Sequence, residues 1–138
     1  MNKIEELPLK NYKMPVEEEQ IYILDDDESV RRSLKLLMVS YGFAVDVFSS
    51  AEEFFSDVPN NAPGCLILDI HLPGFSGWDT MQKLIKTGYN LPVIVITADK
   101  NEVFKERALK AGAVGFLQKP FEDHYLLHMV TRAFNKKI

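Results

Sequence analysis

The chain has 138 residues, of which 46% are hydrophobic and 26% charged, and this composition is typical of one globular domain rather than two. A formal net charge of −4 without a long basic stretch argues against direct binding of nucleic acid. No apolar run is long enough for a membrane span or a secretory signal, so we expect a cytoplasmic protein, and the single cysteine, Cys65, excludes an internal disulfide.

The beginning of the chain differs in pattern from the rest. Residues 1–19 mix charges with two prolines and show no sustained apolar period, so we interpret them as an N-terminal arm or linker. From Gln20 onward, short apolar runs alternate with amphipathic stretches. The apolar runs predict five strands, at residues 21–24, 44–48, 65–68, 93–96 and 114–117. Helical spacing or a capping pattern predicts a helix after each strand, starting near Val30, Ser50, Trp78, Phe104 and Leu126.

The alternation of strands and helices predicts the fold class. Ser50 and Glu53 have the spacing of a capping box, and Asp46 within residues 44–48 indicates a strand at the edge of a sheet. The predicted third helix carries Met81, Leu84 and Ile85. Strand and helix alternate five times, which favours parallel strands, right-handed crossovers and helices on both faces. We therefore predict a single three-layer α/β domain over residues 20–136.

Polar side chains with complementary chemistry follow the predicted strands. Asp25 and Asp26 follow the first strand, Asp69 follows the third, Thr97 the fourth and Lys119 the fifth. In an open α/β sheet the carboxyl ends of the strands form the edge where ligands bind. Carboxylates, a hydroxyl and an amine at one edge indicate a site for a divalent cation and a phosphate group.

A magnesium ion fits the acidic residues. Mg²⁺ is usually held by one or two carboxylates together with waters and phosphate oxygens. Asp26 and Asp69 would supply carboxylate oxygens, Asp25 would act directly or through water, and the backbone carbonyl of His71 would complete the protein ligands. Without a cation, carboxylates crowded together would have raised pKa values. We therefore predict Mg²⁺ as the cofactor.

A phosphoryl group beside that ion would meet the remaining residues. Asp69 would be the nucleophile and would form an acyl phosphate. Lys119 would pair with one phosphoryl oxygen, and Thr97 would donate a hydrogen bond to another. Taken singly, each residue has a plainer interpretation, since acidic residues such as Asp27 often only cap the next helix. Their joint placement at one edge favours the functional interpretation.

These residues together resemble the receiver domain of two-component response regulators. The resemblance runs from Gln20 to Phe134, and several stretches are similar to the nitrogen-fixation and nitrate-type regulators. It rests on four motifs in the expected order: Ile23-Leu24-Asp25-Asp26-Asp27, Leu68-Asp69-Ile70-His71-Leu72-Pro73-Gly74 with Gly77, Ile96-Thr97-Ala98, and Gln118-Lys119-Pro120-Phe121. The implied fold is flavodoxin-like, a five-stranded parallel sheet of order 2-1-3-4-5, for which a chemotaxis receiver is a standard example. The Lys119–Pro120 bond would be cis.

The resemblance also implies a role for each matching residue. Asp69 matches the phosphoacceptor, Lys119 the phosphate-binding lysine and the carbonyl of His71 the backbone metal ligand. The acidic pair that places Mg²⁺ is matched by Asp25 and Asp26. The implied switch residues are Thr97 and the aromatic Phe116, where the family often has tyrosine. His71 and Asp99 flank this site, and we expect them to tune the lifetime of the phosphorylated state.

The implied function is that of a signalling phosphoacceptor rather than an enzyme. A sensor histidine kinase or a phosphotransfer protein would supply the phosphoryl group, and an output domain outside this chain would control transcription. A homodimer through the face of the fourth helix, fifth strand and fifth helix is a further expectation. Two alternatives are a phosphatase with an aspartyl-phosphate intermediate and a pseudo-receiver that acts only through contacts. His71, where such phosphatases carry a second aspartate, counts against the first, and retention of Asp69 counts against the second.

Overall fold

A computed structural model describes residues 19–135 of the chain. Nearly all of the predicted arm, and residue 136 of the predicted domain, lie outside the described residues. The elements are β1 (Gln20–Leu24), α2 (Glu28–Ser40), β2 (Ala44–Phe48), α3 (Ala51–Asp57), β3 (Cys65–Asp69), α4 (Gly77–Lys86), β4 (Val93–Thr97), α5 (Val103–Lys110), β5 (Gly115–Gln118) and α6 (Asp123–Asn135). Among these residues no helix is both long and apolar enough to cross a membrane.

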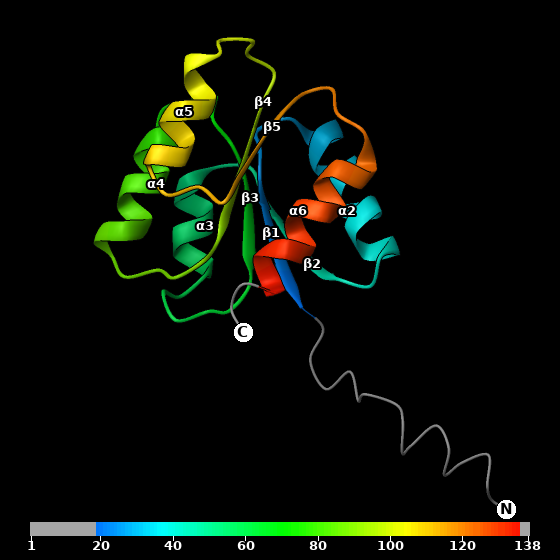
Figure 1. The fold of residues 1–138 in the computed structure, drawn as a ribbon. Coiled ribbons are helices and arrows are strands. Elements are labelled where there is room, and N and C mark those ends of the chain that lie inside the picture. Colours follow the sequence, from blue (N-terminus) through cyan, green and yellow to red (C-terminus); the bar gives the residue numbers. More distant parts are fainter. Residues whose placement is uncertain (1–18, 136–138) are drawn as a thin grey trace, which may run out of the picture.

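The five strands form one parallel sheet of order β2-β1-β3-β4-β5. Helices α2 and α6 cover one face, and α3, α4 and α5 cover the other (Figure 1). The predicted three-layer α/β fold and its strand order are therefore confirmed. The prediction that residues 44–48 form an edge strand is also confirmed, because β2 pairs only with β1 and Asp46 is exposed.

The core is divided by the sheet into two apolar clusters. Successive side chains of a strand point to opposite faces, so alternate residues of β1 enter different clusters. Ile21 and Ile23 pack under α2 and α6, whereas Tyr22 and Leu24 pack under the other three helices. Strands β3 and β4 are buried along their whole length. Burial on both faces explains why these central strands read as continuous apolar runs.

Two local details concern the helices on the α3 and α4 side of the sheet. Ile85 is 67% exposed, because α4 packs through Met81 and Leu84 and Ile85 lies one residue beyond that stripe. At the start of α3, Ser50 accepts a hydrogen bond from the N–H of Glu53, but the Glu53 carboxylate accepts from the N–H of Ser49 instead of Ser50. The predicted capping box is therefore only half formed.

A close approach of backbone to backbone positions the loop after β3. Gly77, the first residue of α4, donates its N–H to the carbonyl of Ile70 at 2.9 Å. A Cβ atom at Gly77 would lie 2.6 Å from Ile70 Cα and 2.7 Å from the carbonyl oxygen of Asp69. Real Cβ atoms do not approach backbone so closely. Glycine at this position therefore lets α4 begin directly against the end of β3.

Candidate functional site

Three carboxylates meet at the carboxyl ends of β1 and β3. Asp25 directly follows β1 and is fully buried, Asp69 is the last residue of β3 and is 5% exposed, and Asp26 is exposed. Each offers a carboxylate oxygen, and these oxygens all lie within 4.8 Å of one another. Within residues 19–135 no other group of three potential metal ligands is this close. The structure thus brings together the side chains predicted to hold a cation.

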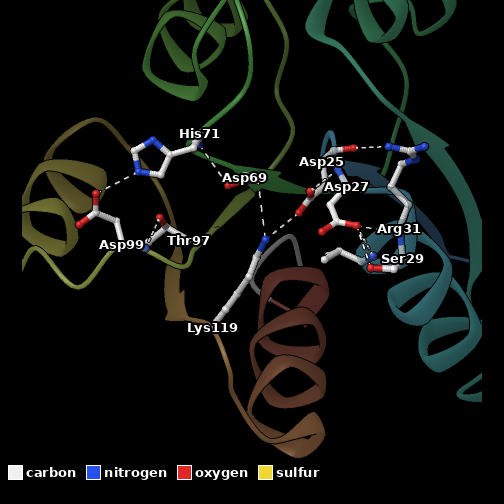
Figure 2. A network of polar contacts seen from close by, with 10 residues as sticks. Asp25, Asp27, Ser29, Arg31, Asp69, His71, Thr97, Asp99 and Lys119 are labelled. Atoms are coloured by element: carbon white, nitrogen blue, oxygen red, sulfur yellow. Dashed lines mark hydrogen bonds and ion pairs between the residues drawn. The ribbon is translucent and has the colours of Figure 1, made fainter.

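Lys119 reaches this acidic cluster from the loop after β5. Its Nζ lies 3.0 Å from Asp25 Oδ2 and 3.9 Å from Asp69 Oδ2, and the side chain is 21% exposed. Figure 2 shows the amine pointing between the two carboxylates. The backbone N–H of Lys119 donates to the carbonyl of Thr97 at 2.7 Å, which fixes the start of this loop against β4. The Lys119–Pro120 bond is cis.

The turn after each strand orients the two buried carboxylates. Asp25 Oδ1 accepts the N–H of Asp27 at 2.9 Å, and Asp69 Oδ1 accepts the N–H of His71 at 3.1 Å. In each carboxylate the second oxygen, Oδ2, is the one near Lys119 Nζ. Because short polar side chains readily bond the backbone two residues on, these contacts also explain how the chain turns out of the sheet.

The surroundings of Asp69 disfavour its ionised form. Burial and then the nearby charge of Asp25 raise the pKa of Asp69 from its ordinary value of 3.8 to about 6. The charge of Lys119 and the hydrogen bond from His71 act in the opposite direction but do not compensate. A group whose ionised form is disfavoured by a second carboxylate gains from a bound cation. The donor set of three carboxylates fits Mg²⁺, a hard cation that prefers oxygen ligands.

The neighbouring acid, Asp27, has a structural role. It is the N-cap of α2, and its Oδ1 accepts hydrogen bonds from the N–H of Ser29 at 2.9 Å and from the Ser29 hydroxyl at 2.8 Å. These bonds from Ser29 lower the pKa of Asp27. The interpretation of Asp27 as a helix cap is therefore the correct one for this residue.

The two predicted switch residues lie on neighbouring strands. Thr97 ends β4 and is fully buried, and its Oγ1 accepts the N–H of Asp99 at 3.0 Å. Phe116 lies in β5, pairs in register with Val95, and packs half-buried against the apolar cluster under α3, α4 and α5. Thr97 thus lies at the carboxyl edge of the sheet, and Phe116 lies on the neighbouring strand, on the side covered by α3, α4 and α5.

One set of contacts at the site was not predicted. Nε2 of His71 lies 3.1 Å from Oδ2 of Asp99, and the His71 ring lies tilted against the ring of Phe104, with centroids 5.9 Å apart. Phe104 in turn meets the edge of Trp78, and the Arg107 guanidinium lies 4.0 Å from the Trp78 ring centroid. These residues lie on two loops and two helices, and the apolar pattern of the sequence gives no signal that they are in contact.

A parallel sheet of this order defines a flavodoxin-like domain, and its carboxyl edge carries the carboxylates and the lysine that were predicted to bind a cation and a phosphate group. Residues 21–131 match the model of the response regulator receiver domain, and the chain belongs to this family. It is therefore the receiver domain of a response regulator.

Several relatives support the assignment. The chain is 43% identical over 113 residues to the response regulator protein TodT of Pseudomonas putida, covering 82% of this chain and 50% of that protein. It is 39% identical over 113 residues to the transcriptional regulatory protein FixJ of Rhizobium meliloti, covering 82% and 55%. The chain thus spans about half the length of these relatives. The similarity to FixJ agrees with the predicted nitrogen-fixation subgroup.

Solved structures agree with the fold. The N-terminal part of FixJ, at 37% identity, superposes with a TM-score of 0.79 and covers 86% of this chain and 95% of that chain. The response regulator StyR, at 36% identity, gives a TM-score of 0.80 and covers 86% of this chain and 60% of its own. A chemotaxis protein, CheY4 of Vibrio cholerae, shares the fold at 21% identity and a TM-score of 0.76.

Proposed function

We propose that Asp69 accepts a phosphoryl group from a phosphohistidine of a sensor histidine kinase or a phosphotransfer protein. The observation that carries this proposal is the meeting of Asp69 with Asp25, Asp26 and Lys119 at one edge of the sheet. One oxygen of Asp69 attacks phosphorus, the bond from phosphorus to the imidazole nitrogen breaks, and the imidazole leaves with its electron pair and takes up a proton. The product is an aspartyl phosphate.

The residues present divide the work of binding among them. Asp25, Asp26 and Asp69 would hold Mg²⁺ with the backbone carbonyl of His71, and the bound ion would supply charge neutralisation to the phosphoryl oxygens. The Lys119 amine, already 3.9 Å from Asp69 Oδ2, pairs with a second side of the group. Phosphoryl transfer depends mainly on such positioning and charge stabilisation.

The conformational response follows from the two switch residues. The hydroxyl of Thr97 turns toward the phosphoryl group, and the ring of Phe116 moves further inward behind it. This change shifts a pre-existing equilibrium between two conformations and alters the face of α5, β5 and α6. Phenylalanine presents no hydroxyl to a partner at this position, so the readout on that face rests on shape and apolar contact.

The output of the switch is inferred from the relatives. Relatives such as FixJ are named as transcriptional regulatory proteins, and the matched segment covers only 55% of FixJ. We infer that the domain acts on transcription through an output domain, with no direct binding of nucleic acid by the domain itself and a cytoplasmic location. Val103 in α5, Val114 just before β5 and Tyr125 in α6 are exposed apolar residues, and we propose a homodimer contact through the face of these three elements.

The test is phosphorylation by a small acyl phosphate such as acetyl phosphate, read by intact mass with and without Mg²⁺. The wild type should gain one phosphoryl group in a reaction that needs Mg²⁺, and Asp69→Asn should gain none. Asp57→Asn, which changes an exposed aspartate at the end of α3, is the matched control and should behave as the wild type. A phosphoryl group that persists in Asp69→Asn, or no gain in the folded wild type, would overturn the proposal.

A further inference from the structure

Strand β2 pairs on one side only among the described residues. The N–H of Ala44 donates to the carbonyl of Glu19 at 3.0 Å, so the backbone groups of Ala44 face β1. Because backbone groups point alternately to the two sides of a strand, those of Val45 and Val47 point away from β1. No described strand lies on that outer side. Two N–H and two C=O groups are therefore available to an added strand.

The surroundings of this outer edge differ between the two faces of the sheet. A cleft of about 450 Å³ lies beside β2, between α2 on one face and α3 on the other (Figure 1). On the α2 face, Val45 and Val47 are half-buried, and Val39 is 48% exposed one helical turn after Lys35, which lines the cleft. On the α3 face, Asp46 is exposed. An added strand must therefore present apolar side chains to the α2 face and a cation to Asp46.

A segment of this chain has that alternation. Residues 1–18, which lie outside the described residues, directly precede the start of the sheet and contain Tyr12 and Met14 with Lys13 between them. An antiparallel pairing with β2 sets Lys13 opposite Asp46. The same register sets Met14 and Tyr12 opposite the two valines. Opposite charges and apolar pairs at directly facing positions both stabilise strand pairing.

The position of a proline and the length of the segment are compatible with this register. The backbone groups of Tyr12 and Met14 would face β2, and those of Lys13 and Pro15 would face solvent, where a missing N–H is tolerated. Five peptide units join Met14 to Glu19 and span at most roughly 17 Å. The distance to be covered is on the order of 12 Å, two strand spacings across and two residues along the strands. The segment is therefore long enough to reach the outer edge of β2.

We propose that residues 12–14 of this chain add to the outer edge of β2 as an antiparallel strand of the same molecule. The added strand would pair with the outward backbone groups of Val45 and Val47 and would occupy the cleft beside them. A charged residue on an edge strand commonly opposes pairing with other chains, and here the charge of Asp46 also favours Lys13 over an apolar residue. The proposal does not depend on the phosphoacceptor function of Asp69.

Hydrogen exchange of the full chain, followed by NMR, tests the strand pairing. In the wild type the amides of Val45 and Val47 should exchange at least about tenfold more slowly than unpaired amides. The amide of Asp46 faces β1 and is the internal reference for an intact sheet. Met14→Asp places a charge against the α2 face and should abolish the protection of both valines, whereas Ile4→Asp, outside the paired residues, should match the wild type. Fast exchange of both valines in the wild type would overturn the proposal.

Exchange of two charges tests the register. Lys13→Glu sets like charges opposite each other and should speed exchange of both valine amides by about threefold. Adding Asp46→Lys to this variant should restore the slow exchange, because the opposite charges then face each other again. Lys10→Glu makes the same change beyond the paired residues and should leave the exchange rates unchanged. A double variant that exchanges as fast as Lys13→Glu alone would contradict the proposed register.

Dilution distinguishes the chain's own segment from that of a second copy. Protection by residues 12–14 of the same molecule is independent of protein concentration, and we expect the two valine amides to exchange at the same rates in dilute and concentrated samples. Protection that falls on dilution would mean that a second copy supplies the added strand, and it would overturn pairing within one molecule.

Discussion

The two halves of the site differ in how their polar groups are held. In one half, Asp25, Asp69 and Lys119 lie at strand ends, with side chains 0%, 7% and 21% exposed. In the other half, His71 and Asp99 lie on loops and are 55% and 36% exposed. Both halves contain a contact of about the same length, 3.0 Å in the first and 3.1 Å in the second. Distance alone therefore does not tell what each contact contributes.

The surroundings of each contact decide its strength. Charges removed from water interact strongly, and removing one partner leaves the other uncompensated. An exposed ion pair is screened by solvent and contributes little. The buried half is thus suited to the phosphoryl transfer that we propose for Asp69. The exposed half can exchange its contacts for contacts with water at small cost in free energy.

Among these substitutions, replacing Lys119 should change the free energy of unfolding most. Lys119→Met leaves Asp25 fully buried without its cation and should lower the free energy of unfolding by about 3 kcal/mol in the absence of Mg²⁺. Urea unfolding followed by circular dichroism measures this change. Lys105→Met, which alters an exposed lysine of α5, is the control and should change stability by less than about 0.5 kcal/mol. Equal losses of stability from the two substitutions would mean that the buried Asp25–Lys119 contact contributes no more than an exposed lysine does.

Asp69→Asn should stabilise the protein at neutral pH when Mg²⁺ is removed by chelation. The pKa of Asp69 is raised in the folded state to about 6, from an ordinary 3.8, so the folded state binds the proton more tightly than the unfolded state. Stability is then lost as pH rises between these two values, by about 3 kcal/mol in full above them. The variant should therefore exceed the wild type at pH 7.5 and match it near pH 4. Urea unfolding at both pH values measures the free energies of unfolding. A difference between the two proteins that is the same at both pH values would contradict the raised pKa of Asp69.

The two halves of the site also differ in how far they could be predicted from the sequence. The strand ends were predictable, because apolar runs end where the chain leaves the core, and parallel strands bring Asp25, Asp69 and Thr97 to one edge. The His71–Asp99 contact depends on the path of two loops, and loops have no apolar period from which that path can be derived. The exposure of Ile85 is not predictable for a related reason, since helical spacing identifies an apolar stripe but not how many of its residues are covered.

Adding Mg²⁺ should stabilise the wild type through the acidic cluster. A ligand that binds only the folded state raises the free energy of unfolding by about 1.4 kcal/mol at a tenfold excess over its Kd. Asp26→Asn changes an exposed carboxylate of the cluster and should lose most of this gain while leaving the metal-free stability nearly unchanged. Thermal unfolding with increasing Mg²⁺ measures both quantities, with Asp57→Asn as control. Full stabilisation of Asp26→Asn by Mg²⁺ would exclude Asp26 as a ligand.

The smallest effect should come from the exposed half. A double-mutant cycle with His71→Phe and Asp99→Ala should give a coupling free energy of about 0.5 kcal/mol in urea unfolding. The same cycle with Asp25→Asn and Lys119→Met should give several times more, because that pair is buried. A coupling near about 0.5 kcal/mol would show that solvent screens the His71–Asp99 contact, as its exposure predicts. A coupling free energy as large as that of the buried pair would show that exposure does not set the strength of the contact, because the two contacts have nearly the same length.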